Sequence, residues 1–306
     1  MDIGEKVLVL MSTYNGQKYI ETQIESILAQ ESVDVFLLVR DDGSTDKTRD
    51  ILETYKKQGK LEWYTGENLG PAKSFMDLIM HVKSLEKFSY YAFCDQDDYW
   101  LPNKLSCAIE CLKKLDANKP LLYYSSTILA DANLDKLTNQ TTVQVNSLTF
   151  KRALICSNAT GCTMCFNEKL LVEAQRYQPE VLMMHDGWLH KLCLALDGQV
   201  YYDENSYIYY RQHGNNAVGG RISFRKKVKR RLKALTTDRQ IRKKTIEQLL
   251  IGYGDSLSDE NRKLCELYSE YDKRITYRLK LLFSKTEINN FRVSIAYKIS
   301  LLLGVF

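Results

Sequence analysis

Residues 7–28, VLVLMSTYNGQKYIETQIESIL, contain the pattern that decides the fold of this chain. The first five residues are a continuous apolar run, which is typical of a strand buried on both faces of a sheet. After the polar turn, apolar side chains recur every three or four positions from Ile20 to Leu28, the spacing of one helical face. A buried strand followed by an amphipathic helix is the first half of a βαβ unit.

The same alternation continues along the chain. Further strands are predicted at residues 35–39, 61–64 and 90–93, with helices after each; Ser44 is a candidate N-cap for the second helix, and Pro102 suits the start of the fourth. The alternation predicts an α/β fold with a mostly parallel sheet covered by helices on both faces. From residue 121 to 210 the pattern is less regular, and strands at 122–124 and 161–166 and a helix at 186–196 are expected.

Polar, turn-rich stretches follow the first four predicted strands. These stretches are residues 12–16 (STYNG), 41–44 (DDGS), 68–71 (NLGP) and 95–98 (DQDD). In open α/β sheets ligands bind beyond the carboxyl ends of the strands. The four stretches are therefore expected to converge on one ligand site.

The acidic stretch contains three carboxylates within four residues, Asp95, Asp97 and Asp98. Hard divalent cations such as Mg2+ or Mn2+ take carboxylate oxygens as ligands, and Asp95 and Asp97 would point the same way on an extended segment. The alternative is a solvated loop in which Asp98 caps the helix that begins near Pro102. A metal site is the favoured interpretation of the cluster.

Several common sites are absent from the sequence. It contains no phosphate-binding P-loop, no dinucleotide-binding G-x-G-x-x-G after the first strand, no G-x-S-x-G elbow and no H-E-x-x-H helix. The eight cysteines are scattered; Cys162 and Cys165 have the C-x-x-C spacing of some metal or redox sites, but without a second pair they are interpreted as buried thiols.

The composition is that of a globular protein, with 306 residues, 44% hydrophobic and 26% charged. The first residues lack the pattern of a signal peptide, and no apolar run reaches the roughly 18 residues of a membrane-spanning helix, so a cytoplasmic location is expected.

The net charge of +5 is unevenly distributed. Residues 221–244 hold twelve Lys or Arg residues against one acidic residue, a local charge of +11, so the rest of the chain sums to −6. Aromatic residues, which single-stranded nucleic-acid sites use, are nearly absent there. An anionic membrane surface is therefore the preferred partner over nucleic acid, with a solvated helical face as the alternative.

Taken together, STYN at 12–15, DDGSTD at 41–46, NLG at 68–70 and DQDD-x-W at 95–100 resemble the family-2 glycosyltransferases of the GT-A fold. The resemblance spans roughly residues 6–220. The later HD-x-W at 185–188 and YRQH-x-x-N at 210–216 are most similar to bacterial rhamnosyltransferases of cell-wall and capsular polysaccharides.

The resemblance implies roles for individual residues. Asp186 would be the catalytic base, although an aspartate in the first turn of a helix also stabilises the helix dipole. His185 departs from the Glu-Asp of many members. The implied nucleotide-sugar-binding residues are Ser12, Thr13, Tyr14, Asn15, Asp41, Asp42, Asn68, Lys73, Asp95, Gln96 and Arg211. The implied ligands of Mn2+ or Mg2+ are Asp95, Asp97, Asp98 and His213.

The sequence thus predicts a GT-A domain over residues 1–220 and a basic, amphipathic helical region over 221–306 that associates with the inner face of the cell membrane. The expected activity is metal-dependent, inverting transfer of a sugar, with dTDP-L-rhamnose the first candidate donor and a lipid-linked glycan the acceptor. A UDP-hexose donor and a non-catalytic nucleotide-sugar-binding scaffold subunit are the alternatives. A homodimer is one oligomeric state that the sequence leaves open.

Overall fold

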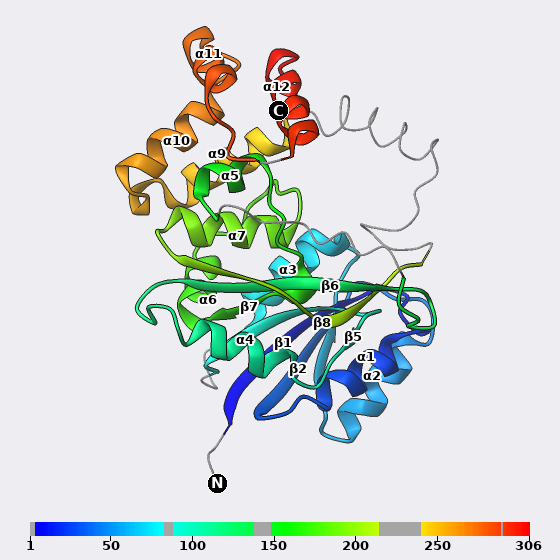
Figure 1. Cartoon of the computed structure of the whole chain (residues 1–306). Coiled ribbons are helices and arrows are strands. Elements are labelled where there is room, and N and C mark those ends of the chain that lie inside the picture. The colour runs from blue at the N-terminus through cyan, green and yellow to red at the C-terminus, as the bar shows by residue number, and fades with distance from the viewer. Residues whose placement is uncertain (1–3, 83–87, 138–147, 214–239, 289) are drawn as a thin grey trace.

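A computed structural model describes residues 4–82, 88–137, 148–213, 240–288 and 290–306. Figure 1 shows a central curled sheet with helices on both faces and a group of C-terminal helices above one of them. The strands are β1 (Glu5–Thr13), β2 (Val33–Asp41), β3 (Glu62–Thr65), β4 (Tyr90–Asp95), β5 (Tyr99–Trp100), β6 (Leu121–Ala130), β7 (Cys165–Asn167) and β8 (Gln199–Arg211).

Among the described residues these strands form one sheet in the order β3-β2-β1-β4-β7-β6-β8-β5. The first four strands of that order pair in parallel, as do β6 and β8, whereas β7 runs antiparallel to both of its neighbours and β5 to β8. The predicted α/β class with a mostly parallel sheet is confirmed.

The helices of the first two thirds of the chain pack on the two faces of the sheet. They are α1 (Ile20–Leu28), α2 (Thr48–Lys57), α3 (Gly70–His81), α4 (Lys104–Leu112), α5 (Phe150–Ile155), α6 (Glu168–Gln175) and α7 (His185–Ala195). One hydrophobic cluster joins β1, β2 and β4 to α1, α2 and α4, and a larger one joins the opposite face to α3, α6 and α7. The alternating elements therefore build two cores around one sheet.

Two local predictions and one alternative interpretation were wrong. Ser44 does not cap α2: its hydroxyl accepts the Asn15 amide (2.9 Å), while Asp46 accepts the Thr48 amide (3.0 Å). Residues 161–166 do not form one strand, because a 3-10 turn, η1 (Gly161–Thr163), precedes the short β7. Asp98 does not cap the fourth helix, which begins at Lys104 with Asn103 as its N-cap.

The C-terminal helices are α9 (Ile241–Tyr253), α10 (Asp259–Ser269), α11 (Ile275–Phe283) and α12 (Phe291–Leu302), with a 3-10 turn, η2 (Gly254–Ser256), between the first two. Ile246 and Leu249 of α9 lie in the same hydrophobic cluster as Trp188 of α7.

The division into 1–220 and 221–306 stays a prediction, and most of the basic segment, 221–239, lies outside the described residues. In the part of the chain that is described, no helix has both the length and the hydropathy needed to cross a bilayer.

Candidate active site

A cavity of about 710 Å³ lies where the carboxyl ends of β1, β2 and β4 meet α3, α5, α7 and α9. The strand-end stretches that the sequence predicted to converge do meet here. Of the predicted site residues, those lining the cavity are Ser12, Tyr14, Asp42, Asn68, Asp95, Gln96, Asp97 and Asp186. Those not in its lining are Thr13, Asn15, Asp41, Lys73, Asp98, Arg211 and His213.

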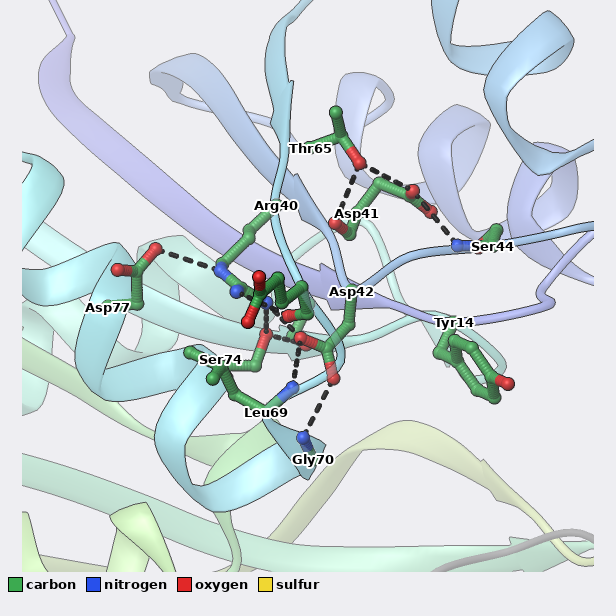
Figure 2. Close-up of polar contacts among 12 residues, drawn as sticks. Tyr14, Arg40, Asp41, Asp42, Ser44, Thr65, Leu69, Gly70, Ser74 and Asp77 are labelled. Atoms are coloured by element: carbon green, nitrogen blue, oxygen red, sulfur yellow. Dashed lines mark hydrogen bonds and ion pairs between the residues drawn. The ribbon is translucent and has the colours of Figure 1, made fainter.

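Asp42 directly follows β2 and is held by several hydrogen bonds, as Figure 2 shows. Its Oδ1 accepts the amide of Leu69 (3.0 Å) and its Oδ2 accepts the amide of Gly70 (2.9 Å), so the carboxylate sits at the N-terminus of α3. A helix N-terminus stabilises a negative charge, and the arrangement orients Asp42 before any ligand arrives. Gly70 adopts a positive φ of 73°, which glycine accepts without strain.

Arg40 is the second support of Asp42, and the sequence did not single it out. Its buried guanidinium pairs with Asp42, with Asp77 of α3 (2.8 Å) and with the Ser74 hydroxyl (3.0 Å), as drawn in Figure 2. Burial alone would lower the pKa of Arg40, but its hydrogen bonds to Asp42 and Asp77 raise it, so the charge is retained. A buried cation with two carboxylate partners fixes β2 to α3.

Three predicted nucleotide-binding residues hold the strand-end loops together instead of lining the cavity. Asp41 is fully buried and accepts the Ser44 amide (3.0 Å). The Thr13 hydroxyl donates to Gln96 (2.5 Å), and the Asn15 side chain accepts the Thr45 amide (2.8 Å). These contacts join the loops after β1, β2 and β4 into one unit.

The carboxylate cluster divides into a part that lines the cavity and a part that is fully buried. Asp95 and Asp97 line the cavity, whereas Asp98 is fully buried, and its Oδ1 accepts the Arg211 amide (3.1 Å). Burial, and then the charges of Asp97 and Asp186, raise the pKa of Asp95 to about 7. Burial, and then Asp97 and Asp95, raise the pKa of Asp98 well above its ordinary range. Three acidic groups so close cannot all ionise without a cation.

The residues around the cluster fit a divalent cation. Asp97 Oδ2 lies 2.7 Å from His213 Nε2, so a carboxylate oxygen and an imidazole nitrogen can ligate one ion. The Oδ2 of Asp98 is buried and has no hydrogen-bond partner in the described chain. Cys162 also lies beside Asp95 and Asp98, but burial raises the pKa of its thiol well above the ordinary range, which leaves it a poor ligand for Mn2+ or Mg2+.

Arg211 and Lys73 lie apart from the cavity lining. Arg211 donates from Nε to the Asp97 carbonyl (2.7 Å) and from a terminal nitrogen to the Ala132 carbonyl (2.5 Å), and its guanidinium lies 4.4 Å from the centre of the Tyr19 ring. These contacts tie the end of β8 to the carboxylate loop. Lys73 is exposed on the first turn of α3.

Asp186 lies in the first turn of α7, and its Oδ2 accepts the Gly161 amide (3.2 Å). Its Oδ1 accepts the Gly187 amide in the first turn of α7 (2.5 Å), so Asp186 both lines the cavity and satisfies an N–H of the helix terminus. The preceding His185 is buried and stacks on Phe75 with ring centroids 3.9 Å apart. Burial lowers the pKa of His185 to about 4, so the ring is neutral near neutral pH and packs under the site. A Cβ on Gly161 would lie 2.6 Å from the His185 ring, so only glycine fits there.

The opposite wall of the cavity was not anticipated from the sequence. It includes residues 156–160, which follow α5, together with Lys191 of α7 and Arg242 and Thr245 of α9. Residues 156–160 form no regular element in the structure, and no motif marks them. Only the position of Arg242 in the basic segment could have drawn attention to it.

Comparison with known proteins agrees with this geometry. The chain is 33% identical over 236 residues to the dTDP-rhamnosyl transferase RfbG of Shigella flexneri, covering 72% of this chain and 77% of that protein. It is 33% identical over 152 residues to the putative teichuronic acid biosynthesis glycosyltransferase TuaG of Bacillus subtilis, covering 48% of this chain and 56% of that one.

The fold is also similar to those of solved glycosyltransferases. S. aureus TarS in complex with UDP-GlcNAc has a TM-score of 0.56 at 17% identity, covering 98% of this chain and 93% of that one. The mannosyltransferase PcManGT of Pyrobaculum calidifontis, in complex with GDP-Man and Mn2+, has a TM-score of 0.51 at 15% identity, covering 99% and 89%. The fold is thus that of the GT-A enzymes. The family model for glycosyl transferase family 2 matches residues 8–169, and the chain belongs to that family of enzymes.

Proposed function

We propose that this glycosyltransferase transfers L-rhamnose from dTDP-L-rhamnose, with inversion and with the help of a divalent cation, to a lipid-linked glycan. The observation that carries the proposal is one cavity that holds Asp42, the Asp95–Asp97 carboxylates and Asp186 together. Similarity to a dTDP-rhamnosyl transferase over most of both chains supports the donor, and similarity to a putative teichuronic acid enzyme supports a cell-wall glycan as product.

The nucleoside is proposed to bind at Asp42. The Oδ1 of Asp42 already accepts from Arg40 and Leu69, whereas among the described residues Oδ2 accepts only from Gly70. A carboxylate oxygen can accept two hydrogen bonds, so Oδ2 can also accept the ring N–H of a pyrimidine. Tyr14 and Asn68 line the same part of the cavity.

Asp97 and His213, with Asp95, are the proposed ligands of Mn2+ or Mg2+. When bound there, the cation supplies a Lewis acid that stabilises negative charge on the departing nucleoside diphosphate. Asp98, also predicted as a ligand, lies one residue further along the loop and is fully buried.

Asp186 is the proposed base. In the reaction an acceptor hydroxyl loses its proton to Asp186, its oxygen bonds to the anomeric carbon of the sugar, and the bond from that carbon to the diphosphate breaks. A single positioned carboxylate suffices for such an inverting displacement, whereas glycosidases need two carboxyl groups across the bond. The hydrogen bond from the Gly161 amide holds Asp186 in place.

Calorimetric titration of nucleotide sugars in the presence of Mn2+ tests the donor assignment. Tighter binding of dTDP-L-rhamnose than of UDP-GlcNAc or UDP-glucose is expected, followed by rhamnose transfer to lipid-linked oligosaccharides. A preference for a UDP-hexose would support the alternative donor, for which the likeness to TarS in complex with UDP-GlcNAc is an argument. Binding of no pyrimidine nucleotide at all would refute both.

The partner of the C-terminal helices is proposed to be an anionic membrane surface. Exposed apolar residues recur every four positions on α11, at Ile275, Leu279 and Phe283, and again on α12. The row on α12 consists of Phe291, Ile295 and Ile299. The same helices carry Arg278, Lys280, Arg292 and Lys298. Apolar rows with neighbouring cations favour the interface of an anionic bilayer.

Flotation with liposomes that contain phosphatidylglycerol tests this surface. The variants Phe283→Ser and Phe291→Ser should reduce flotation, whereas Val172→Ser, at an exposed position of α6, should not. Point variants are preferred to truncation because α9 shares its hydrophobic cluster with α7. Retention on DNA instead of liposomes would favour a nucleic-acid partner. Membrane association at the inner face of the cell membrane, and a homodimer, stay predictions.

A further inference from the structure

Two cations line the cavity on the side of α7 and α9, where no proposed donor contact lies. Lys191 is on α7, four residues after Gly187, and Arg242 is on α9. Both side chains border the same cavity as Asp186. Neither forms an ion pair with any carboxylate in the described parts of the chain.

Lys191 is almost completely buried, with 6% of the residue exposed. Its ammonium donates to the Gly187 carbonyl (3.1 Å), the one hydrogen bond recorded for that group among the described residues. Burial lowers the pKa of Lys191 to about 8; Asp186 raises it and Arg242 lowers it, so Lys191 stands within reach of both charges. An ammonium buried without a counter-charge is costly unless a ligand supplies the charge.

Arg242 differs from the residue that follows it. Lys243 pairs with both carboxylate oxygens of Asp272 (2.8 Å), but Arg242 has no hydrogen bond or ion pair in the described structure. Burial lowers the pKa of Arg242 as well. Arg242 also lies in the first turn of α9, where the helix dipole disfavours a cation, so helix stability does not explain it.

Neutral hydrogen-bonding groups complete this part of the cavity. The Ser157 hydroxyl contacts His190 Nδ1 (2.8 Å), which fixes its position. The Asn158 oxygen accepts from the Cys156 thiol (3.1 Å), and its amide nitrogen has no hydrogen bond with any described residue. Two cations and these polar groups form a surface suited to an oxyanion.

We propose that Lys191 and Arg242 bind an anionic oxygen group of the acceptor, a phosphate or a carboxylate, and thereby place the acceptor hydroxyl at Asp186. The inference rests on the proposed function, because Asp186 is taken as the base. In this arrangement the diphosphate of the donor binds the metal ion held by Asp97. The anion of the acceptor binds Lys191 and Arg242 on the opposite wall, so each anion has its own positive partner. The substrate class is thus an acceptor that carries an anionic oxygen group, on its glycan or on its lipid carrier.

Anion binding to the nucleotide-loaded protein tests the proposal. The full-length protein, saturated with UDP and Mg2+ to fill the donor site, is titrated with inorganic phosphate and, separately, with glucuronate. Lys191→Met and Arg242→Gln should each weaken binding of the preferred anion about tenfold to a hundredfold, the loss of one charge-assisted hydrogen bond. Lys244→Met, on the exposed face of the same helix, should leave it unchanged.

The two probes distinguish the sources of the anion. Preference for phosphate indicates a phosphorylated acceptor or the phosphate of its lipid carrier, and preference for glucuronate indicates an acidic sugar. No binding of either anion, or equal binding by the variants, would overturn the proposal. So would binding that UDP abolishes, because the pair would then serve the donor diphosphate.

Nucleotide affinity of each variant is measured in the same series. Unchanged UDP affinity shows that the fold and donor site are intact, and Arg242→Gln, at a partly exposed position, guards against misfolding of Lys191→Met. Failure of UDP and dTDP to bind the wild-type protein would instead refute the proposed function, whatever the anions do.

Discussion

The two walls of the cavity are built in opposite ways. The wall proposed to bind the donor, here called the donor wall, is formed by Ser12, Tyr14, Asp42, Asn68 and residues 95–97. Around Asp42 on this wall the protein itself pairs the charges: Arg40 bonds Asp42 and Asp77, and Arg49 bonds the neighbouring Asp41 (2.8 Å). On the wall of α7 and α9, Lys191 and Arg242 have no carboxylate partner among the described residues. The donor wall is thus preorganised around Asp42 before binding, whereas the second wall leaves its charges for a ligand.

The difference also concerns how each wall is encoded. The donor wall consists of short stretches that directly follow strands, so its residues are close in sequence to the elements that place them. The second wall brings together α5, α7 and α9 from across the last half of the chain through the hydrophobic cluster around Trp188. Substitutions on the two walls should therefore impair different steps of the reaction, donor binding on one wall and acceptor binding on the other.

The largest effect is expected from Asp186→Asn. Removal of the proposed base should lower kcat by about a hundredfold to ten-thousandfold, because general base catalysis contributes that much. The affinity for the nucleotide sugar should stay within a factor of two or so, since the donor wall is untouched. Turnover assays and calorimetry on the same sample measure both, with the exposed Glu180→Gln as control.

The Asp186→Asn variant also separates an enzyme from a scaffold subunit. If the chain only bound a nucleotide sugar for an assembly complex, polysaccharide synthesis in cells would be unaffected by the substitution. Full complementation by Asp186→Asn would therefore refute a catalytic role.

Arg40→Met should have the next largest effect, on stability. It leaves the carboxylates of Asp42 and Asp77 buried or half-buried without their cation, which should cost about 3–5 kcal/mol of unfolding free energy. Urea unfolding measures the change. Lys56→Met, which removes an exposed ion pair with Glu62, should change it by less than about 1 kcal/mol. Equal effects would contradict the preorganised donor wall.

Asp97→Asn and Asp98→Asn form a matched pair that tests the carboxylate cluster. If Asp97 is a ligand, replacing its carboxylate with the amide of asparagine should weaken Mn2+ binding by at least about a hundredfold. Burial raises the pKa of Asp98, which favours its neutral form, so an isosteric neutral amide should change metal affinity less than the same change at Asp97. Mn2+ titration followed by electron paramagnetic resonance measures both. A larger loss in Asp98→Asn would make Asp98 the principal ligand.

The sequence predicted that the strand-end stretches meet at one edge of the sheet because strand periodicity and strand-end turns are local properties. Asp42, Asp97 and Asp186 lie in one cavity, as their motifs implied. What the motifs could not show is the pairing of side chains. Nothing near Arg40 indicates that it bonds Asp77, 37 residues away, and Asp41 was taken for a binding residue although it is fully buried.

The second wall escaped prediction for a different reason. It depends on α9 packing against α5, a contact between segments about 90 residues apart that no local period encodes. Arg242 and Lys243 are adjacent members of one basic run, yet one lines the cavity and the other pairs with Asp272. The composition shows that this segment is basic. Only the tertiary contacts show that Lys243 pairs with a carboxylate of the protein while Arg242 faces the cavity.

The smallest predicted effect is a pH dependence at Lys191. Its native pKa of about 8 lies below the ordinary lysine value of 10.5 because of burial and of Arg242 on α9, opposed by Asp186 on its own helix and by Cys156 after α5. Between these values the unfolded chain binds more protons than the native one. The ligand-free protein should therefore gain stability as the pH rises from about 8 to about 10.

Anion affinity should change in the opposite direction. Because the ammonium is lost as the pH passes 8, glucuronate binding should weaken by up to about tenfold between pH 7 and 9. Lys191→Arg keeps its charge throughout that range and should bind with nearly constant affinity. Calorimetry on UDP-loaded protein at several pH values measures the difference. If wild type and Lys191→Arg showed the same profile, the ammonium would not contact the anion, and the contrast between the two walls would rest on Arg242 alone.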